Sequence, residues 1–311
     1  MVVLEQKYSG CGAPVHEPAM VPQVLLCLAP RPGERALDLT VGTGGHSLAL
    51  AGAVGPSGLL IGLDCDESAL RTAEARLTEA AACPFRLFHA RFSRALEVTQ
   101  EAAPGGFDVA AADLGVGTHQ LMGPGRGFSF DADERLDMRF DRTAGPSAYD
   151  VVNQTPEAEL ADIFYNFGEE RFSRQIAARV CVQRARKPVE TAAELADIVK
   201  TVYARRSLRG HTWRIHPATR VMMALRICVN RELEELDALL ETLPRLLARG
   251  GRACVLTYHS LEARRVKDAW RRQQKAGLIS VMKPSPLRPT EEQVSSNPRV
   301  RSAQLRACRK L

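Results

Sequence analysis

The sequence predicts an α/β protein in which a mainly parallel sheet is interrupted by an all-helical insertion, and two observations support this prediction. First, short apolar segments alternate with helical patterns over roughly the first hundred residues, an arrangement typical of βαβ units. Second, residues 155–206 show only helical patterns, and a strand pattern returns at 252–258. We therefore expect one α/β domain made of residues 1–120 and 213–311, with the helical insertion at 121–212.

Four short apolar segments in the first part of the chain have the length of buried strands. They are residues 35–40, 59–63, 85–88 and 107–112. Helical patterns precede and separate them. Apolar residues share one helical face over 21–28, a second helix is expected from about residue 46, and the carboxylate of Asp66 is placed to cap a third.

The expected insertion begins as a loop and continues as helices. Residues 115–149 are rich in Gly, Asp, Arg and Phe without a clear period, which predicts a loop. Further on, Thr191 and Glu194 form a capping box ahead of an apolar helical face. After the insertion, one long helix is expected from about residue 217 to 247.

Composition and cysteine spacing limit the functional classes. The 311 residues are 45% apolar and 25% charged, as in ordinary globular proteins. No apolar run approaches the ~20 residues of a membrane span, and the first ten residues lack the features of a secretory signal. None of the eight cysteines stands in a CxxC pair, which argues against a zinc site or a disulfide framework. We therefore expect a cytoplasmic protein with no metal and no membrane partner.

Positive charge is concentrated near the C-terminus. The net charge is +6, yet residues 264–311 alone hold thirteen Lys or Arg against three Asp or Glu. A smaller basic cluster comprises Lys200, Arg205, Arg206, Arg209 and Arg214. Such segments either bind a polyanion such as a nucleic acid or form a solvated surface, and the charge pattern alone leaves both interpretations open.

A glycine cluster at the end of the first expected strand indicates a ligand site. Gly42, Gly44 and Gly45 allow a ligand to approach the backbone and the N-terminus of the next helix closely. Asp64 ends the next strand, where a carboxylate can accept hydrogen bonds from ribose hydroxyls. A dinucleotide and S-adenosylmethionine both fit this layout, although the dinucleotide pattern GxGxxG would require glycine where Ser47 stands.

A second acidic residue favours the methyl donor over the dinucleotide. Asp113 closes the fourth expected strand, at the sheet edge where ligands of open α/β sheets bind. The alternative is that Asp113 caps a helix or a turn.

A series of unusual strings runs along the chain in a characteristic order. They are HEP at 16–18, GGHS at 44–47, GLDCD at 62–66, DLG at 113–115, QL at 120–121, RGFSF at 126–130, LDMR at 136–139, GEER at 168–171, HPATR at 216–220, ALRI at 224–227, NREL at 230–233, HSLE at 259–262, NPR at 297–299, RSA at 301–303 and LR at 305–306. In these strings the chain resembles, nearly from end to end, the bacterial small-subunit rRNA (cytosine-N4)-methyltransferases of the RsmH or MraW family.

The resemblance implies a class I, Rossmann-like S-adenosylmethionine-dependent methyltransferase sheet with an inserted helical domain. It implies S-adenosylmethionine as the methyl donor. The acceptor would be the exocyclic N4 amine of a cytosine in the decoding region of 16S rRNA, within the small ribosomal subunit. The donor site implied by the matching positions comprises Gly44, Gly45, His46, Asp64, Phe92, Asp113 and Gln120. Whether the protein forms a homodimer is left open.

Methylation of an exocyclic amine calls for a group that accepts a hydrogen bond from the amine and then its proton, because the cytosine amine is a poor nucleophile. Asp113 is the first candidate and Asp137 the second, while His259 is a candidate proton acceptor. Two alternatives remain. Asp137 can instead pair with Arg139 or Arg142, and His259 can be a core histidine at a strand end.

Contacts with RNA are expected at the string RGFSF and at three further arginines. In RGFSF, Arg126 and Phe128, with Phe130, are candidates to hold an unstacked base, or else the two rings pack at the domain junction. Arg139, Arg299 and Arg301 are candidate substrate-binding residues, and the segment 297–306 is expected to close over the active site.

The chain departs from the family pattern at four places: Thr43 stands for Arg, residues 221–223 replace a Phe-Gln pair, Tyr258 stands for Phe, and Ala263 stands for Asp. If Ser260 caps the last long helix, Ala263 removes a carboxylate from its third position, which weakens the cap. Two further hypotheses therefore remain beside the methyltransferase. One is a non-catalytic RNA-binding or ribosome-assembly protein on the same fold, and the other is an NAD-linked oxidoreductase.

Overall fold

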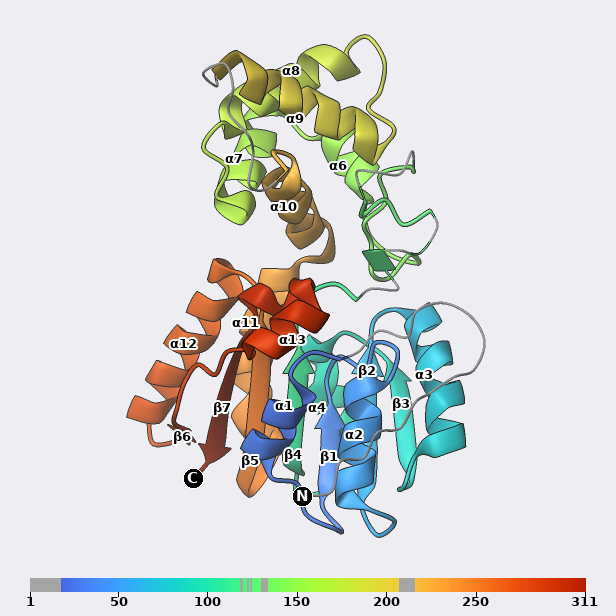
Figure 1. Cartoon of the computed structure of the whole chain (residues 1–311), viewed down its shortest axis with the longest axis vertical. Helices are drawn as coiled ribbons and strands as arrows, with labels where there is room; N and C mark the ends of the chain where they lie inside the picture. The colour runs from blue at the N-terminus through green and yellow to red at the C-terminus, as the bar shows by residue number, and fades with distance from the viewer. Residues whose placement is uncertain (1–17, 118–119, 122, 124, 130–133, 207–215) are drawn as a thin grey trace.

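The computed structural model describes residues 18–117, 120–121, 123, 125–129, 134–206 and 216–311. It consists of an α/β unit and a helical unit that stands above the sheet (Figure 1). His16, Phe130, Arg209 and Arg214, which the sequence singles out, lie outside the described residues. Within the part of the chain that is described, no helix has the length and hydrophobicity needed to cross a membrane.

The α/β unit is built on a seven-stranded sheet in the order β3-β2-β1-β4-β5-β7-β6. Its strands are β1 (Arg35–Asp38), β2 (Leu59–Asp64), β3 (Phe85–His89), β4 (Phe107–Asp113), β5 (Leu247–Thr257), β6 (Ile279–Val281) and β7 (Gln304–Lys310). The first five strands are parallel, and β7 runs antiparallel to both β5 and β6. The four early strands confirm the prediction, whereas the basic composition of the C-terminal segment conceals β6 and β7.

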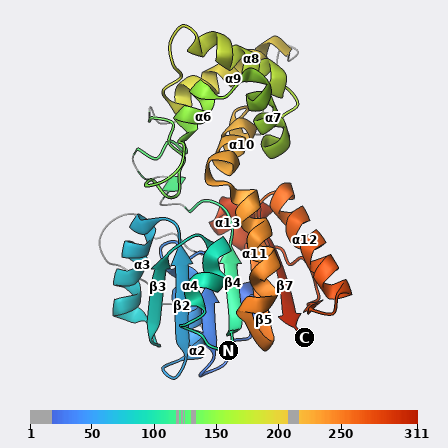
Figure 2. The same ribbon diagram turned by 180° about the vertical axis from the view of Figure 1, so that it is seen from behind.

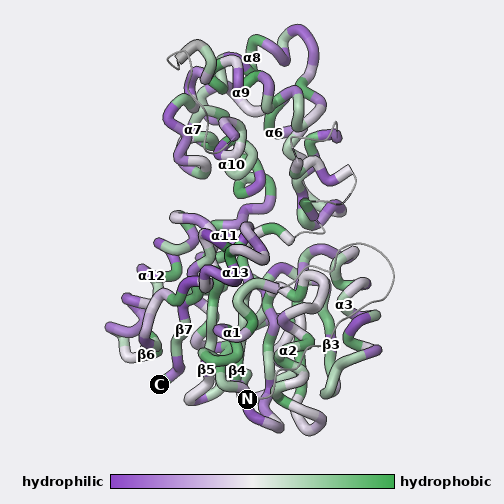
Figure 3. The backbone as a smooth tube through the Cα atoms, viewed as in Figure 1, coloured by the Kyte–Doolittle hydropathy of each residue, from purple (hydrophilic) through white to green (hydrophobic). Residues whose placement is uncertain are grey.

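Helices cover both faces of the sheet. On one face lie α1 (Val21–Leu28), α2 (Gly45–Val54) and α3 (Glu67–Ala80), and on the other lie the short α4 (Ala95–Thr99), α11 (Glu232–Leu246) and α12 (Ser260–Lys275), as the two opposite views show (Figures 1 and 2). The side chains of β1 alternate between the two cores: Ala36 packs on the first face and Leu37 on the second. Strands that are buried on both faces of a sheet consist mostly of apolar residues, and this is the composition of β4 and β5 (Figure 3).

Three short elements lie close to the carboxyl edge of the sheet (Figure 1). They are η1 (Phe92–Arg94), α13 (Glu291–Ser296) and η2 (Pro298–Ser302). Asn297 accepts a hydrogen bond from the backbone of Arg299 at 3.2 Å and so starts the η2 turn. Val300 of this turn is buried in the core of the first face, which anchors the turn to the α/β unit.

The helical unit has a hydrophobic core of its own. Its helices are α6 (Ala148–Gln154), α7 (Glu157–Gly168), α8 (Ser173–Arg184), α9 (Ala192–Arg206) and α10 (Thr219–Asn230). Leu160, Phe164 and Leu225 are fully buried between them. The expected capping box is present, because Glu194 N donates to Thr191 Oγ1 at 3.2 Å and Thr191 N donates to Glu194 Oε2 at 3.3 Å.

The single helix expected over 217–247 is instead two helices, α10 and α11. Arg231 separates them with left-handed dihedral angles, φ 54° and ψ 37°. Leu225 of α10 packs in the helical core, whereas Leu240 of α11 packs against the sheet. The helical unit therefore extends to about residue 230 rather than 212, because a continuous helical pattern does not reveal a turn in the backbone between two cores.

Candidate functional site

The described residues enclose a cavity of about 310 Å³ at the carboxyl ends of β1, β2, β4 and β5. Ligands of open α/β sheets bind at this edge, where the strand order reverses. The residues predicted from sequence that line this cavity are Gly45, His46, Asp64, Phe92, Asp113, Gln120 and Arg299. Gly44 stands between the lining residues Thr43 and Gly45 but is not itself part of the lining, and neither are Arg126, Phe128, Asp137, Arg139, His259 and Arg301.

The glycine turn after β1 brings backbone groups to the cavity wall. Gly44 has φ 87°, a left-handed conformation that favours glycine, and a Cβ there would lie 3.3 Å from Cβ of Ala73. Gly44 precedes α2, which begins without a side-chain cap. Gly45 and His46 line the cavity at this helix end, so its backbone N–H groups are available to a polar or anionic ligand group.

Asp64 is fixed at the end of β2 by two backbone hydrogen bonds. Gly42 N donates to Oδ2 at 2.7 Å, and Asp66 N donates to Oδ1 at 2.8 Å. Asp64 also lines the cavity, at the end of β2. The carboxylate thus also ties the glycine turn to the neighbouring strand.

Asp113 ends β4 and lies between two potential proton donors. Tyr258 Oη donates to Asp113 Oδ1 at 2.7 Å, and His46 Nδ1 lies 3.7 Å from Oδ2. His46 Nε2 is 2.9 Å from the carbonyl oxygen of Ala19, which can only accept, so this nitrogen carries a proton. Burial raises the pKa of Asp113, whereas the charge of His46 and the Tyr258 hydrogen bond lower it.

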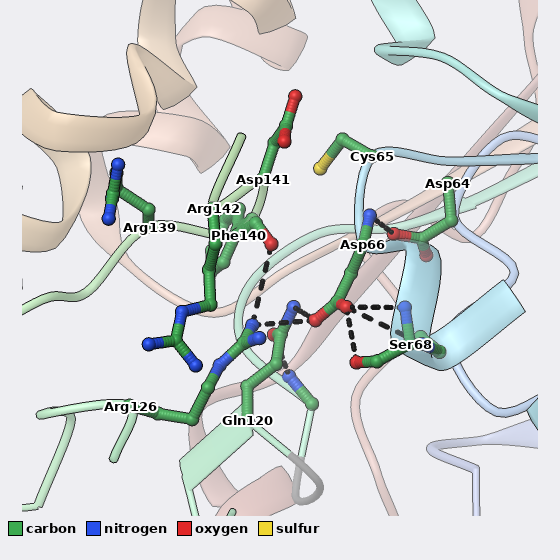
Figure 4. A network of polar contacts seen from close by, with 12 residues as sticks. Asp64, Cys65, Asp66, Ser68, Gln120, Arg126, Arg139, Phe140, Asp141 and Arg142 are labelled. Carbon is green, nitrogen blue, oxygen red and sulfur yellow. Dashed lines mark hydrogen bonds and ion pairs between the residues drawn. The ribbon is translucent and has the colours of Figure 1, made fainter. Parts of the chain in front are cut away.

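Asp66 connects the start of α3 to Gln120 and Arg126 in the segment that leads to the helical unit (Figure 4). Its Oδ1 caps α3 by accepting from Ser68 N at 3.0 Å and from Ala69 N at 3.4 Å, as the sequence predicts. Its Oδ2 accepts from Gln120 Nε2 at 3.1 Å and from Arg126 at 2.6 Å. The side chain of Arg126 is therefore held in a buried ion pair, a contact that the sequence analysis did not foresee.

Two other predicted site residues lie in the loop beside the helical unit. Asp137 forms a two-point ion pair with Arg139, at 3.0 and 2.8 Å, which is the alternative that the sequence left open. Burial opposes ionisation of Asp137, but the hydrogen bonds and charge of Arg139 outweigh it and lower the pKa. Phe128 is 8% exposed in the helical core and stacks on Phe140, with ring centroids 5.9 Å apart.

His259, rather than Ser260, caps α12. His259 Nδ1 accepts from Glu262 N at 3.4 Å, and Glu262 Oε2 accepts from His259 N at 3.3 Å, which completes a capping box. The expected cap at Ser260 is therefore wrong, and Glu262 supplies the carboxylate that Ala263 was expected to lack. Ser260 Oγ instead donates to Glu169 Oε2 of the helical unit at 3.1 Å.

The cavity has a further polar wall that sequence reasoning missed. It is formed by Arg226, Asn230, Glu232, Tyr258 and Glu262. Arg226 forms a buried two-point ion pair with Glu232, at 2.7 and 2.9 Å. These residues stand in or beside the strings quoted above, but the turn at Arg231 that brings them together has no pattern in the sequence.

One group among the described residues has the composition of a metal site. Ligand atoms of Glu232, His259 and Glu262 lie within 4.8 Å of one another. Arg226 already neutralises Glu232, and the amides of Tyr258 and His259 already bind Glu262. Glu232 and Glu262 are therefore paired with protein groups, whereas His259 Nε2 is buried without a hydrogen-bond partner in the described part of the chain and lies 3.1 Å from Glu262 Oε1.

The fold and the cavity together define a class I, Rossmann-like methyltransferase with an inserted helical unit. The chain belongs to the MraW methylase family, whose sequence model matches residues 13–311.

Curated relatives agree with this family. Proteins named ribosomal RNA small subunit methyltransferase H are 44% identical in Acidobacterium capsulatum, over 95% of this chain and 98% of the relative, and 43% identical in a Cyanothece species, over 96% and 95%. A solved rRNA methylase from Streptococcus thermophilus is 12% identical with a TM-score of 0.41, over 96% of this chain and 99% of the other. The family assignment rests on the sequence relatives.

We expect Asp66→Asn to destabilise the protein while keeping the cap on α3, because asparagine retains the capping oxygen. It leaves the Arg126 guanidinium buried without its counter-ion, which lowers the free energy of unfolding by about 3–5 kcal/mol. Urea denaturation measures the change. Adding Arg126→Met should recover part of the loss, and Glu97→Gln, which breaks the exposed Arg94–Glu97 pair, is the control. Equal midpoints for Asp66→Asn and Glu97→Gln would contradict the assignment.

Proposed function

We propose that the protein transfers a methyl group from S-adenosylmethionine to the exocyclic N4 amine of a cytosine in the decoding region of 16S rRNA. The observation that carries the proposal is the cavity at the carboxyl edge, where the glycine turn, Asp64 and Asp113 meet in a chain of the MraW methylase family. The names of the relatives support rRNA of the small ribosomal subunit as the substrate. The resemblance described above supports cytosine N4 as the acceptor.

The lining of the cavity supports S-adenosylmethionine as the donor. We assign the ribose hydroxyls to the carboxylate of Asp64, the adenine to Phe92, and the polar end of the donor to the backbone of Gly45 and His46. Gln120 lines the cavity while its amide binds Asp66, so it orients the wall on that side. Ser47, which occupies the third glycine position of a dinucleotide fingerprint, favours the methyl donor over NAD.

Asp113 is the group of this chain that we assign to the acceptor amine. When bound, the donor supplies an electrophilic methyl group on a sulfonium. The Asp113 carboxylate accepts a hydrogen bond from the amine and takes up the proton that the amine loses. Asp137 and His259 have structural partners in Arg139 and Glu262, which supports positioning roles for both.

The rim of the cavity supplies positive charge for the RNA. Arg299 and Arg301 are exposed on η2, and Arg299 lines the cavity. We assign these side chains to phosphates on either side of the target cytosine, which must leave its stack to enter the cavity. The helical unit, which closes the other side through Phe140 and Asn230, is assigned to recognition of the surrounding RNA.

Nucleoside mass spectrometry of small-subunit rRNA tests the proposal. Cells without this gene should lack N4-methylcytidine in the decoding region, and the wild-type gene should restore it. The Asp113→Asn variant, expressed at the same level, should restore it poorly because its amide cannot take up the proton. An rRNA whose N4-methylcytidine content is independent of the gene would refute the acceptor assignment.

Asp64→Ala should raise the dissociation constant of S-adenosylmethionine at least about tenfold, because a hydrogen bond to a charged group contributes about 1.5–3 kcal/mol. Isothermal titration calorimetry measures it. Asp162→Ala removes an exposed carboxylate of the helical unit and is the matched control. If both variants bind the donor as tightly as wild type, the role of Asp64 is wrong.

Arg299→Ala should weaken binding to unmodified small subunits and flatten its salt dependence. One phosphate contact fewer lowers the slope of log K against log salt by about one. The control is Arg249→Ala, an exposed arginine at the opposite end of β5. Identical slopes for Arg299→Ala and wild type would show that Arg299 contacts no phosphate.

A further inference from the structure

We propose that Tyr258 is a positioning residue that keeps the Asp113 carboxylate ionised and oriented for the acceptor amine. The inference rests on the proposed function only for the role of Asp113. The hydrogen bond between Tyr258 and Asp113 is a feature of the structure itself. The resemblance described above implies phenylalanine at this position, where this chain has the tyrosine hydroxyl.

The sheet register places the two side chains together. Asp113 of β4 pairs with Leu256 of β5, and Tyr258 lies two residues further on, so its side chain projects on the same side. Tyr258 Oη donates to Asp113 Oδ1 at 2.7 Å, a distance typical of a charge-assisted hydrogen bond. Both residues line the cavity.

Two further contacts hold the tyrosine ring in place. Its backbone N–H donates to Glu262 Oε2 at 2.8 Å. The ring edge lies against Gly115, where a Cβ would be only 3.3 Å from Tyr258 Cδ2. Gly115 has φ 110°, so the backbone that supports the ring is itself in a conformation that favours glycine. The contact of the backbone with Glu262 and the contact of the ring with Gly115 together direct the hydroxyl at Asp113.

The charges around Asp113 make this hydrogen bond important. Asp38 at the end of β1 and Glu262 of α12 disfavour a negative charge on Asp113, whereas His46 of α2 favours it. His46 Nδ1 lies 3.7 Å away, beyond hydrogen-bond distance, so Tyr258 makes the shorter polar contact of the two. Asp113 is half-buried and two other carboxylates disfavour its negative charge, so a short hydrogen bond helps it to remain ionised.

The phenol keeps its proton under all working conditions. Burial, followed by the negative charge of Asp113, raises the pKa of Tyr258 well above its usual range, so the hydroxyl remains a donor. Burial raises the pKa of Asp113, and the hydrogen bond from Tyr258 is one of the two contributions that lower it. Removing the hydroxyl therefore raises the pKa of Asp113, and the carboxyl becomes protonated at higher pH.

The test compares Tyr258→Phe with wild type in single-turnover methylation of unmodified small subunits over a range of pH. A protonated Asp113 cannot take up the amine proton. The acid limb of the rate–pH profile of Tyr258→Phe should therefore lie about one pH unit higher than that of wild type. At pH values below this limb the variant should be about tenfold slower than wild type. The plateau rate should also fall, because the Asp113 carboxylate has lost the donor that orients it for the acceptor amine.

Tyr203→Phe is the matched control. It removes another tyrosine–carboxylate hydrogen bond, from Tyr203 Oη to Glu170 Oε2 at 2.8 Å, inside the helical unit. Its acid limb should coincide with that of wild type. Fluorotyrosine at position 258 is a stronger donor, so it should move the acid limb to lower pH. Coincident acid limbs for wild type, Tyr258→Phe and the fluorotyrosine protein would overturn the inference.

Infrared titration separates this inference from the proposed function, because it needs no substrate. The band of the protonated Asp113 carboxyl is identified by its loss in Asp113→Asn. In Tyr258→Phe it should appear at higher pH than in wild type. Equal titrations overturn the inference even if the protein methylates cytosine N4. A shifted titration in a protein that methylates no RNA supports the coupling and counts against the proposed function instead.

Discussion

The buried carboxylate of Asp66 is the interaction on which the architecture of the cavity depends. One oxygen caps α3, and the other receives Gln120 and Arg126 from the loop between the two units. A buried charge is tolerated only when it is paired and hydrogen-bonded. Asp66 therefore needs Arg126 as its counter-ion, and Arg126 needs Asp66. Because Asp66 N also binds Asp64, the same turn fixes the ligand-facing carboxylate and the loop that covers it.

A second junction joins the two units through backbone geometry. Arg231 turns the chain from the helical core to the sheet, and Asn230 beside it is 3% exposed. Its amide donates to Met138 O at 2.8 Å and accepts from Phe140 N at 2.7 Å, so it binds the backbone of the loop at two points. The position of Phe140 at the cavity wall thus depends on contacts from both units.

Local patterns were sufficient for the early strands and for the glycine turn, because strand period, turn residues and caps depend on neighbours in sequence. They also placed Asp64 and Asp113 at the correct sheet edge, since parallel strands end together. Partners distant in sequence could not be predicted in this way. The pairing of Arg126 with Asp66 and the end of α10 at Arg231 are set by tertiary packing, and neither leaves a periodic signal.

The three carboxylates that end neighbouring strands show why residue type and strand position do not define a role. Asp38, Asp64 and Asp113 occupy equivalent ends of β1, β2 and β4. Asp38 is 1% exposed, and its Oδ2 accepts from Ser47 Oγ at 2.6 Å, so it stabilises the start of α2. Asp64 accepts from the backbone amides of Gly42 and Asp66, whereas Asp113 accepts from the Tyr258 hydroxyl. The partners of each carboxylate, rather than its place in the strand, therefore separate the structural role of Asp38 from the roles proposed for Asp64 and Asp113.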